Sequence, residues 1–152
     1  MISSNNKHFI VIYHDESEIF RSERAGIIAG LTMARLAHGS DLLGSTVSIS
    51  HLGITSARLC SHFSIANVKA LNVSPAAISY LVEKNISLDY SVIAEDIDSS
   101  LDKLSSSYVE TEKLFECLQL ALLSFASWFR LPSDDEIAAT PSLRIGTGGG
   151  GT

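Results

Sequence analysis

The sequence predicts an α/β fold in which flanking helices cover a small, mainly parallel sheet and a long apolar helix follows near the C-terminus. Short runs rich in Ile and Val alternate with stretches of helical periodicity, the order expected of strand–helix–strand units. Hydrophobic residues make up 45% of the chain, enough for a buried core. The length of 152 residues is typical of one domain.

The first strand is expected at 8–14, where the apolar run of HFIVIYH is bounded by NNK before it and DES after it. A helix is expected from Ser22 to about Ala37, with Gly39 as its stop. Small residues at Gly26, Gly30 and Ala34 form a stripe along this helix, which predicts close packing against a neighbouring element.

The middle of the chain contains the clearest local signal. Val and Ile alternate with serines at 46–52 and predict a second strand. Within 53–73 the pattern is ambiguous: we expect a helix around 57–63 and then a loop, and one or two additional strands either in this region or in 97–107.

A helix begins after Ser74, which has the residue type of an N-cap and is followed by Pro75 at the first helical position. Asn85 is its expected stop. Alternating apolar residues from Ile86 to Val92 predict a third strand.

The long apolar helix is expected from Ser107 to Arg130, because Ser107 and Glu110 have the spacing of a capping box and Pro132 ends the pattern. We therefore predict one α/β domain over residues 1–132 and a flexible acidic, Gly-rich tail over 133–152. Five of the last seven residues are glycine, which loses the most backbone freedom on ordering. The tail is interpreted as a disordered end, as a docking segment anchored by SLRI, or as the processed end of a ubiquitin-like modifier.

The charge pattern argues against nucleic-acid binding. The net charge is −6 with 11 basic residues, and these are scattered rather than clustered on one stretch. We expect a cytoplasmic protein without a membrane segment, because the N-terminus lacks the pattern of a signal peptide and charges interrupt the apolar stretch 114–131. No resident cofactor is indicated.

Carboxylates follow two of the predicted strands and suggest a metal site. If the first and third strands are neighbours in a parallel sheet, these side chains converge on one edge, with His51 as an acid–base group. The candidate metal ligands are Asp15, Glu16, Glu95, Asp96 and Asp98. The alternative is that these acids simply precede helices, where the helix dipole favours negative charge.

The two cysteines, Cys60 and Cys117, have no metal-type spacing and are interpreted as free thiols. Cys60 lies two residues from His62, but side chains two apart on a helix point in different directions. Core packing is therefore the favoured role of both cysteines, and no catalytic residue is assigned.

The long helix is apolar on its flanks as well as on its core face, which indicates burial or an interface. A domain of this size has few places to bury such a helix, so we predict that it contacts another copy or a partner protein. The alternative is a central helix covered within the monomer. The candidate contact residues are Phe115, Leu120, Leu123 and Trp128 on the helix and Leu143 and Ile145 in the tail.

The segments FIVIYHD, ARLAHG and LVEKNISLDYSV resemble the DsrE/TusD-like sulfur-relay family. The resemblance covers about the first third of the chain and residues 78–93. It implies a small oligomeric α/β protein whose active members carry a cysteine after a central strand. This chain has IAEDID after its third strand, with no cysteine there, so the resemblance implies a non-catalytic member.

The sequence thus favours a non-catalytic accessory or adaptor subunit that acts through self-association and binding of a protein partner. The alternatives are a metal-dependent enzyme with an acidic strand-end site, a sulfur-relay-type subunit, and a tail-processed ubiquitin-like modifier.

Overall fold

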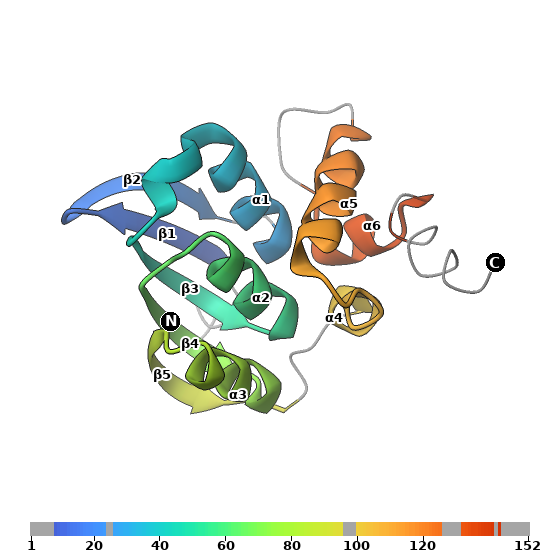
Figure 1. Cartoon of the computed structure of the whole chain (residues 1–152). Helices are drawn as coiled ribbons and strands as arrows, with labels where there is room; N and C mark the ends of the chain where they lie inside the picture. The colour runs from blue at the N-terminus through green and yellow to red at the C-terminus, as the bar shows by residue number, and fades with distance from the viewer. Residues whose placement is uncertain (1–7, 24–25, 96–99, 126–131, 142, 144–152) are drawn as a thin grey trace.

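A computed structural model describes residues 8–23, 26–95, 100–125, 132–141 and 143 of the chain (Figure 1). The elements are, in order, β1 (Phe9–His14), β2 (Ser17–Glu23), α1 (Ile27–His38), the 3-10 helix η2 (Gly39–Leu42), β3 (Thr46–Leu52), α2 (Ile54–His62), β4 (Asn67–Val73), α3 (Pro75–Glu83), β5 (Ser87–Ile93), α4 (Ser100–Ser105), α5 (Thr111–Leu123) and α6 (Asp134–Ala138). The fold is α/β with flanking helices, as the sequence predicts.

The five strands form one mixed sheet in the order β2-β1-β3-β4-β5. β3, β4 and β5 run parallel, whereas β1 is antiparallel to both of its neighbours. The prediction of a mainly parallel sheet is therefore wrong on the β1–β2 side. The physical reason is the two-residue connection between β1 and β2, which can only join antiparallel strands.

This β1–β2 hairpin was missed because its turn lacks the usual residues. Asp15 and Glu16 both have positive φ, 52° and 68°, which is the region that favours Asn-Gly or Asp-Gly. Without that signature, the sequence pattern predicts a helix starting at Ser22. The helix instead begins at Ile27, because Ser17–Glu23 is paired with β1.

Several predictions are confirmed by the structure. The strand at 46–52 is β3, and β4 is an additional strand within 53–73. Helix α3 begins as predicted, with the Ser74 hydroxyl accepting a hydrogen bond from the Ala77 N–H at 3.2 Å and Pro75 at the first position. These elements have purely local signals, namely alternation and an N-cap, so they can be identified without knowing the rest of the fold.

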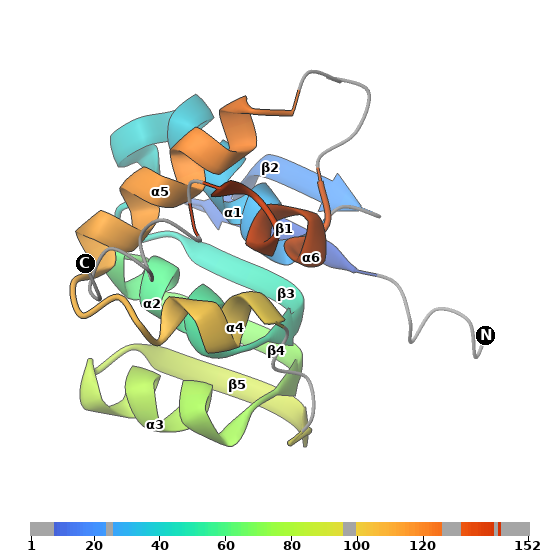
Figure 2. The same ribbon diagram turned by 90° about the vertical axis from the view of Figure 1, so that its right-hand side faces the viewer.

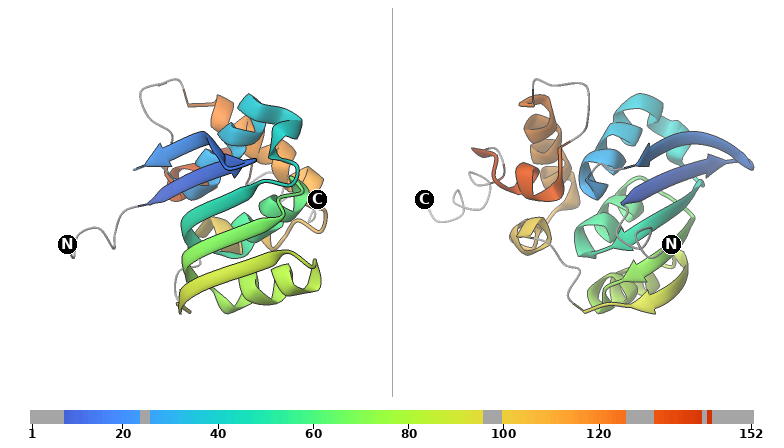
Figure 3. Two further views of the ribbon diagram at one scale, coloured as in Figure 1. Left: turned by 90° about the vertical axis from the view of Figure 1, so that its left-hand side faces the viewer. Right: turned by 180° about the vertical axis from the view of Figure 1, so that it is seen from behind.

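The molecule has three layers (Figures 1 and 2). The sheet forms the first layer, and α1, α2 and α3 lie along one of its faces. α4, α5 and α6 form the third layer and pack on α1 and α2 from outside. In Figure 3 (left) the strands are seen with the helices behind them, so the other face of the sheet carries no helix of the described chain.

The core fills the space between the sheet and the helices. Alternate residues of the inner strands point toward the helices, as the period of a strand requires. These buried residues form one cluster with residues from every α-helix, α4 included through Leu101. The strand residues of the cluster include Ile10, Ile12, Val47, Ile49, Val68 and Ala70.

The predicted long apolar helix is not found among the described residues. α5 has 13 residues and begins after Glu110, which makes no side-chain cap, so the predicted start at Ser107 is wrong. It ends at Leu123, where the Ser124 N–H turns back to the carbonyl oxygens of Leu120 and Ala121. The residues from 126 to 131 lie outside the described part.

The start of the predicted tail is folded. Ser133 and Glu136 form a capping box that opens α6, with Ser133 N–H donating to the Glu136 carboxylate at 2.8 Å. Ile137 and Leu143 are buried in the core, and the Tyr108 hydroxyl donates to the Leu143 carbonyl at 2.9 Å. The expected boundary after residue 132 therefore falls inside the folded chain, whereas residues 144–152 lie outside the described part.

Candidate functional site

One end of the sheet is the place where α/β folds commonly bind ligands. β2 and β3 point the same way, because β1 is antiparallel to both. Each of the connections β2–α1–β3, β3–α2–β4 and β4–α3–β5 therefore starts its helix at the same end of the sheet, outside the carboxyl ends of these strands. Helix N-termini at such an end present unpaired N–H groups that attract anions.

A carboxylate of the chain itself occupies the N-terminus of α2. The N–H of Thr55 donates to Asp102 Oδ1 at 2.8 Å, across 47 residues of sequence. The N-cap of this helix is Gly53, and a Cβ there would lie 2.7 Å from Asp102 Oδ2. The glycine thus permits the close approach of a buried aspartate from α4, which takes the position that an external anion would occupy.

The N-terminus of α1 is closed in the same way by α6. The N–H of Ile28 donates to Asp134 Oδ1 at 2.9 Å, across 106 residues. Gly26 is the N-cap and has no side chain to cap the helix. A Cβ on Gly26 would lie 2.5 Å from the Pro132 carbonyl oxygen, so this site too depends on a glycine.

The N-terminus of α3 is capped locally by Ser74. All three helices at this end of the sheet thus have their N-termini bonded by side chains of the chain, two of them by carboxylates. An anionic ligand would have to displace Asp102 or Asp134 to reach the N–H groups of α1 or α2.

Burial raises the pKa of the Asp134 carboxyl to about 6. Loss of solvation is the main cause; the hydrogen bond from Ile28 opposes it, and the nearby charges of Asp102 and Asp135 add to it. Because this pKa lies above the ordinary value of 3.8, the folded state binds a proton that the unfolded state releases between these two pH values. Asp134 therefore adds stability as the pH falls through 6, and this contribution is lost as the pH rises above 6.

Replacing Asp134 by asparagine tests this linkage. The amide oxygen of D134N can still accept the hydrogen bond from Ile28, but the charge that burial disfavours is absent. We expect the variant to be more stable than the wild type at pH 7.5, by about 1–2 kcal/mol, and to lose this advantage near pH 4.5. Urea denaturation at the two pH values measures the effect. Equal differences in stability at both pH values would contradict the assignment.

Arg58 connects α2 to the third layer from a buried position. Its guanidinium donates to the carbonyl oxygens of Ser105 at 2.8 Å and Tyr108 at 2.6 Å, and to the Thr111 hydroxyl at 3.2 Å. These acceptors lie at the end of α4, in the loop that follows and at the start of α5. Burial lowers the pKa of Arg58, and its hydrogen bonds to backbone carbonyls indicate a structural role.

Cys60 lies in the core and is unsuited to nucleophilic chemistry. Its side chain is fully buried, and this burial raises the pKa of the thiol to about 12, so the thiolate is scarce at neutral pH. The His62 ring packs against the rings of Phe63 and Phe115. Cys117 is a free, partly buried thiol on α5.

We expect native protein to react with one equivalent of a thiol reagent slowly at Cys117 and not at Cys60. Full reaction of both thiols should follow only when guanidinium chloride unfolds the chain. Mass spectrometry of peptides from native protein treated with iodoacetamide at pH 8 identifies the modified residue. Labelling of Cys60 at the rate of Cys117 would show that the core opens readily at α2.

The candidate metal ligands do not form one cluster among the residues described. Asp15 and Glu16 lie in the β1–β2 turn, at the end where β3 begins, because Tyr13 pairs with Thr46. Glu95 follows β5 at the opposite end of the sheet, and β3 and β4 lie between β5 and β1. Asp96 and Asp98 lie outside the described residues.

Within the described part of the chain, no group of three or more His, Cys, Asp or Glu side chains is arranged to hold a metal ion. The assumption behind the predicted site is that the first predicted strand, β1, and the third, β5, are parallel neighbours. It is wrong, because β3 and β4 lie between them. His51 is partly buried, stacks on His8 with ring centres 4.8 Å apart, and has a lowered pKa because of desolvation and of that second histidine.

The uncovered face of the sheet is shallowly hollowed. One hollow of about 450 Å³ is lined by Tyr13, Asp15, Glu16, Thr46, Ser48 and Lys69. A smaller one continues from Ser48 and Lys69 to β5. Hydroxyl groups, two carboxylates and one ammonium group make this surface polar, which agrees with a sheet face that is exposed to water.

The predicted partner-binding residues divide between core and surface. Phe115 and Leu143 are both buried. α5 packs on α1 and α2, and the Tyr108 hydroxyl, in the loop before α5, donates to the Leu143 carbonyl. Leu120 and Leu123 are 58% and 62% exposed on the outer side of α5. Trp128 and Ile145 lie outside the described residues.

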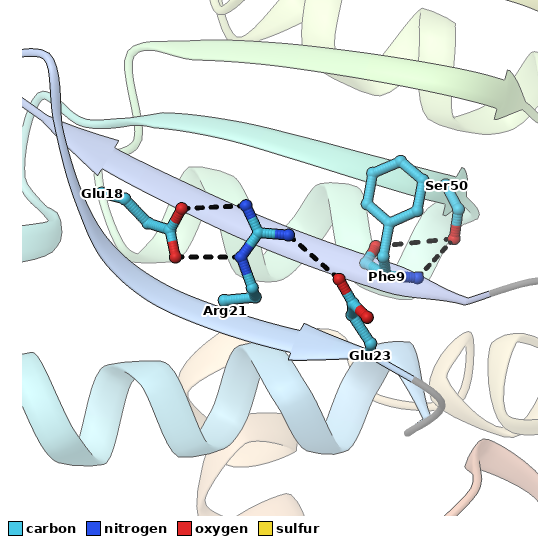
Figure 4. Close-up of polar contacts among 5 residues, drawn as sticks. All are labelled: Phe9, Glu18, Arg21, Glu23 and Ser50. Carbon is cyan, nitrogen blue, oxygen red and sulfur yellow. Dashed lines mark hydrogen bonds and ion pairs between the residues drawn. The ribbon is translucent and has the colours of Figure 1, made fainter.

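The two edges of the sheet differ in charge. On edge strand β2, Arg21 bonds to Glu18 at 2.9 Å and to Glu23 at 3.0 Å, which also lowers the pKa of Glu18 (Figure 4). On the opposite edge, β5 carries Tyr90, Val92 and Ile93, which are 45%, 52% and 50% exposed. Charged side chains on an edge strand hinder its pairing with strands of other chains. Asp89 is the one charged residue of β5.

No helix in the described part of the chain is both long and apolar enough to cross a membrane.

Comparison with known proteins identifies a shared fold but no family. No family model and no curated protein matches the sequence. The structure is similar to that of a DUF1893 family protein from Thermotoga maritima, with a TM-score of 0.60 and 19% identity over 78% of this chain and 81% of that one. At this identity the similarity shows the fold alone.

Two weaker similarities are to a dCMP deaminase from the cyanophage S-TIM5 and to a bifunctional diaminohydroxyphosphoribosylaminopyrimidine deaminase/reductase from Thermotoga maritima. The first has a TM-score of 0.46 and 10% identity over 55% of this chain and 79% of that one. The second has a TM-score of 0.47 and 13% identity over 77% of this chain and 34% of that one. These values support no statement about the activity of this chain, and the three similarities do not show the resemblance to the DsrE/TusD-like family.

Proposed function

We propose that this protein is a non-catalytic accessory subunit that acts by association, both with a second copy of itself and with a partner protein. One observation carries the proposal. At the carboxyl end of the sheet, where a ligand would bind, the chain's own Asp134 and Asp102 accept hydrogen bonds from the N-termini of α1 and α2. The N–H groups that many α/β proteins direct at a ligand here hold α4 and α6 in place.

Apolar side chains on the surface support association. The exposed residues of β5 lie on a sheet edge, and Leu120 and Leu123 lie on the outer side of α5. The two groups belong to the first and third layers of the fold (Figure 2). In this proposal the β5 edge serves self-association and the two leucines of α5 contact the partner protein, so that the two contacts do not compete.

Light scattering coupled to size-exclusion chromatography tests the proposal. Over a concentration series from 1 µM to 1 mM, we expect the mass to rise from the monomer value of 16.3 kDa toward twice that value. A protein that remains at 16.3 kDa throughout the series would contradict self-association and with it the proposed function.

A further inference from the structure

We infer that two copies of the chain pair through the free edges of β5, antiparallel about a twofold axis at Tyr90, and join their sheets into one. This inference rests on the proposed function and names the surface that carries it. It depends on the backbone of β5, on the side chains that the strand exposes, and on the fit of the strand to itself.

The outer edge of β5 presents backbone groups that no strand of the described chain pairs. β5 is the last strand of the sheet, bonded to β4 alone. At its start, the N–H of Ser87 donates to the Ala66 carbonyl at 3.2 Å, on the β4 side. Because backbone groups alternate along a strand, the N–H and C=O groups of Leu88 and Tyr90 point away from β4. At the far end the N–H of Ala94 again donates to the β4 side, to the Val73 carbonyl at 2.9 Å, so this alternation does not extend to Val92. Another extended strand satisfies such groups with the geometry of a sheet.

The side chains of β5 suit pairing better than exposure to water. Tyr, Val and Ile are residues that favour strands, and Tyr90, Val92 and Ile93 are each about half exposed. The strand contains neither proline nor lysine, the residues that commonly guard an edge. β2, of the same length, carries an ion-pair triad instead, so the two edges of this sheet are not equivalent (Figure 4).

The strand is complementary to a second copy of itself. In an antiparallel pair centred on Tyr90, Leu88 faces Val92, Tyr90 faces Tyr90, and Asp89 faces Ser91. The pairs nearest the axis thus place apolar residues opposite apolar residues and each carboxylate opposite a hydroxyl, whereas at the ends of the pair Ile93 faces Ser87. Such a twofold interface uses the same surface on both copies.

Charge also favours this surface for two copies of an acidic chain. Each chain has a net charge of −6, so association requires an interface with little charge of its own. β5 contributes one carboxylate, whereas the hollow on the uncovered face has Asp15 and Glu16 and the β2 edge has Glu18 and Glu23. Among these surfaces β5 brings the fewest carboxylates together; each of the other two also carries one cation, Arg21 on β2 and Lys69 in the hollow.

Cross-linking through an introduced cysteine tests the geometry. Tyr90→Cys in a Cys117→Ser background places one thiol on each strand at the axis, where opposing Cα atoms lie about 5.5 Å apart, within the range that a disulfide spans. We expect mild oxidation to convert most of the protein at 100 µM into a covalent dimer on a non-reducing gel. Leu120→Cys in the same background is the matched control, because Leu120 is similarly exposed, and it is expected to remain monomeric on the gel.

A charge variant gives an independent readout without oxidation. Tyr90→Lys combined with Val92→Lys places lysines on the edge, and we expect the dissociation constant of the dimer to rise at least tenfold. Leu120→Lys combined with Leu123→Lys is the control and should leave that constant unchanged. Circular dichroism establishes that each variant is folded.

The outcomes separate this inference from the proposed function. If the wild type dimerises but the Tyr90→Cys variant does not cross-link and the β5 lysine variant dimerises normally, the pairing through β5 is wrong and self-association uses another surface. If the wild type is a monomer at every concentration, both the pairing and the proposed function are wrong.

Discussion

Replacing Arg58 by alanine is expected to lower the free energy of unfolding by about 3–5 kcal/mol. The substitution removes a buried guanidinium that bonds the carbonyl oxygens of Ser105 and Tyr108 and the hydroxyl of Thr111. These acceptors would remain without a partner in a poorly solvated place, and each buried unsatisfied group costs about 1–3 kcal/mol. The packing of the arginine stem against its neighbours is lost as well.

Urea denaturation of Arg58→Ala and Arg58→Lys at pH 7 measures this effect. Lysine keeps the charge but has a single nitrogen, so it can reach fewer of the three acceptors, and an intermediate loss is expected. Lys113→Ala, an exposed position on α5, is the control and should change stability by less than about 0.5 kcal/mol. A loss below 1 kcal/mol in Arg58→Ala would mean that water replaces the guanidinium without cost.

The second large effect is expected at Gly26. In Gly26→Ala the new Cβ would lie 2.5 Å from the Pro132 carbonyl oxygen and 2.8 Å from the Asp134 backbone nitrogen. Both are backbone atoms, so the segment leading into α6 must move away, and the hydrogen bond from Ile28 to Asp134 lengthens. We expect stability to fall by about 2–3 kcal/mol.

The thermal midpoint of Gly26→Ala, followed by circular dichroism, gives the measurement. Leu36→Ala on the same helix is a suitable control, because Leu36 is exposed and its removal opens no cavity. A midpoint equal to that of the wild type would show that α6 is not held closely against the start of α1.

The parts of the fold that the sequence predicts are those with local causes. The β3 pattern is an alternation over 46–52, and α3 follows an N-cap at Ser74. The β1–β2 hairpin is not predictable in this way, because Asp15 and Glu16 adopt positive φ without a glycine. The sheet direction inferred for β1 fails with it, since that direction depends on the hairpin.

The carboxylates that bond the N-termini of α1 and α2 are not predictable from the sequence for a different reason. Asp102 and Asp134 bond to helices that lie 47 and 106 residues away in the chain, and no local pattern reports such distances. The glycines at Gly26 and Gly53 were a usable signal, because a glycine just before a helix permits close approach of another segment. In the sequence, Gly26 stands out only as part of a small-residue stripe with Gly30 and Ala34.

The sequence predicts one long apolar helix over 107–130, whereas the described part of this segment contains the 13-residue α5. Phe115 lies on α5 in the third layer, and it is buried because α5 packs on α1 and α2. α5 also contacts α6. The sequence does not indicate this layer, because its pattern after residue 132 is typical of a flexible tail. Leu120 and Leu123 nevertheless remain exposed, and the strand with the most exposed apolar residues is β5, which sequence alternation identified only as a strand.

The association of two chains through β5 is tested most directly by amide hydrogen exchange at single-residue resolution. Exchange of the Leu88 and Tyr90 amide protons is followed by NMR at 20 µM and at 1 mM protein. If the strands pair, the protection of these two amides rises with concentration while that of the β4-facing Ser87 amide stays constant. Identical exchange rates of Leu88 and Tyr90 at both concentrations would contradict the account.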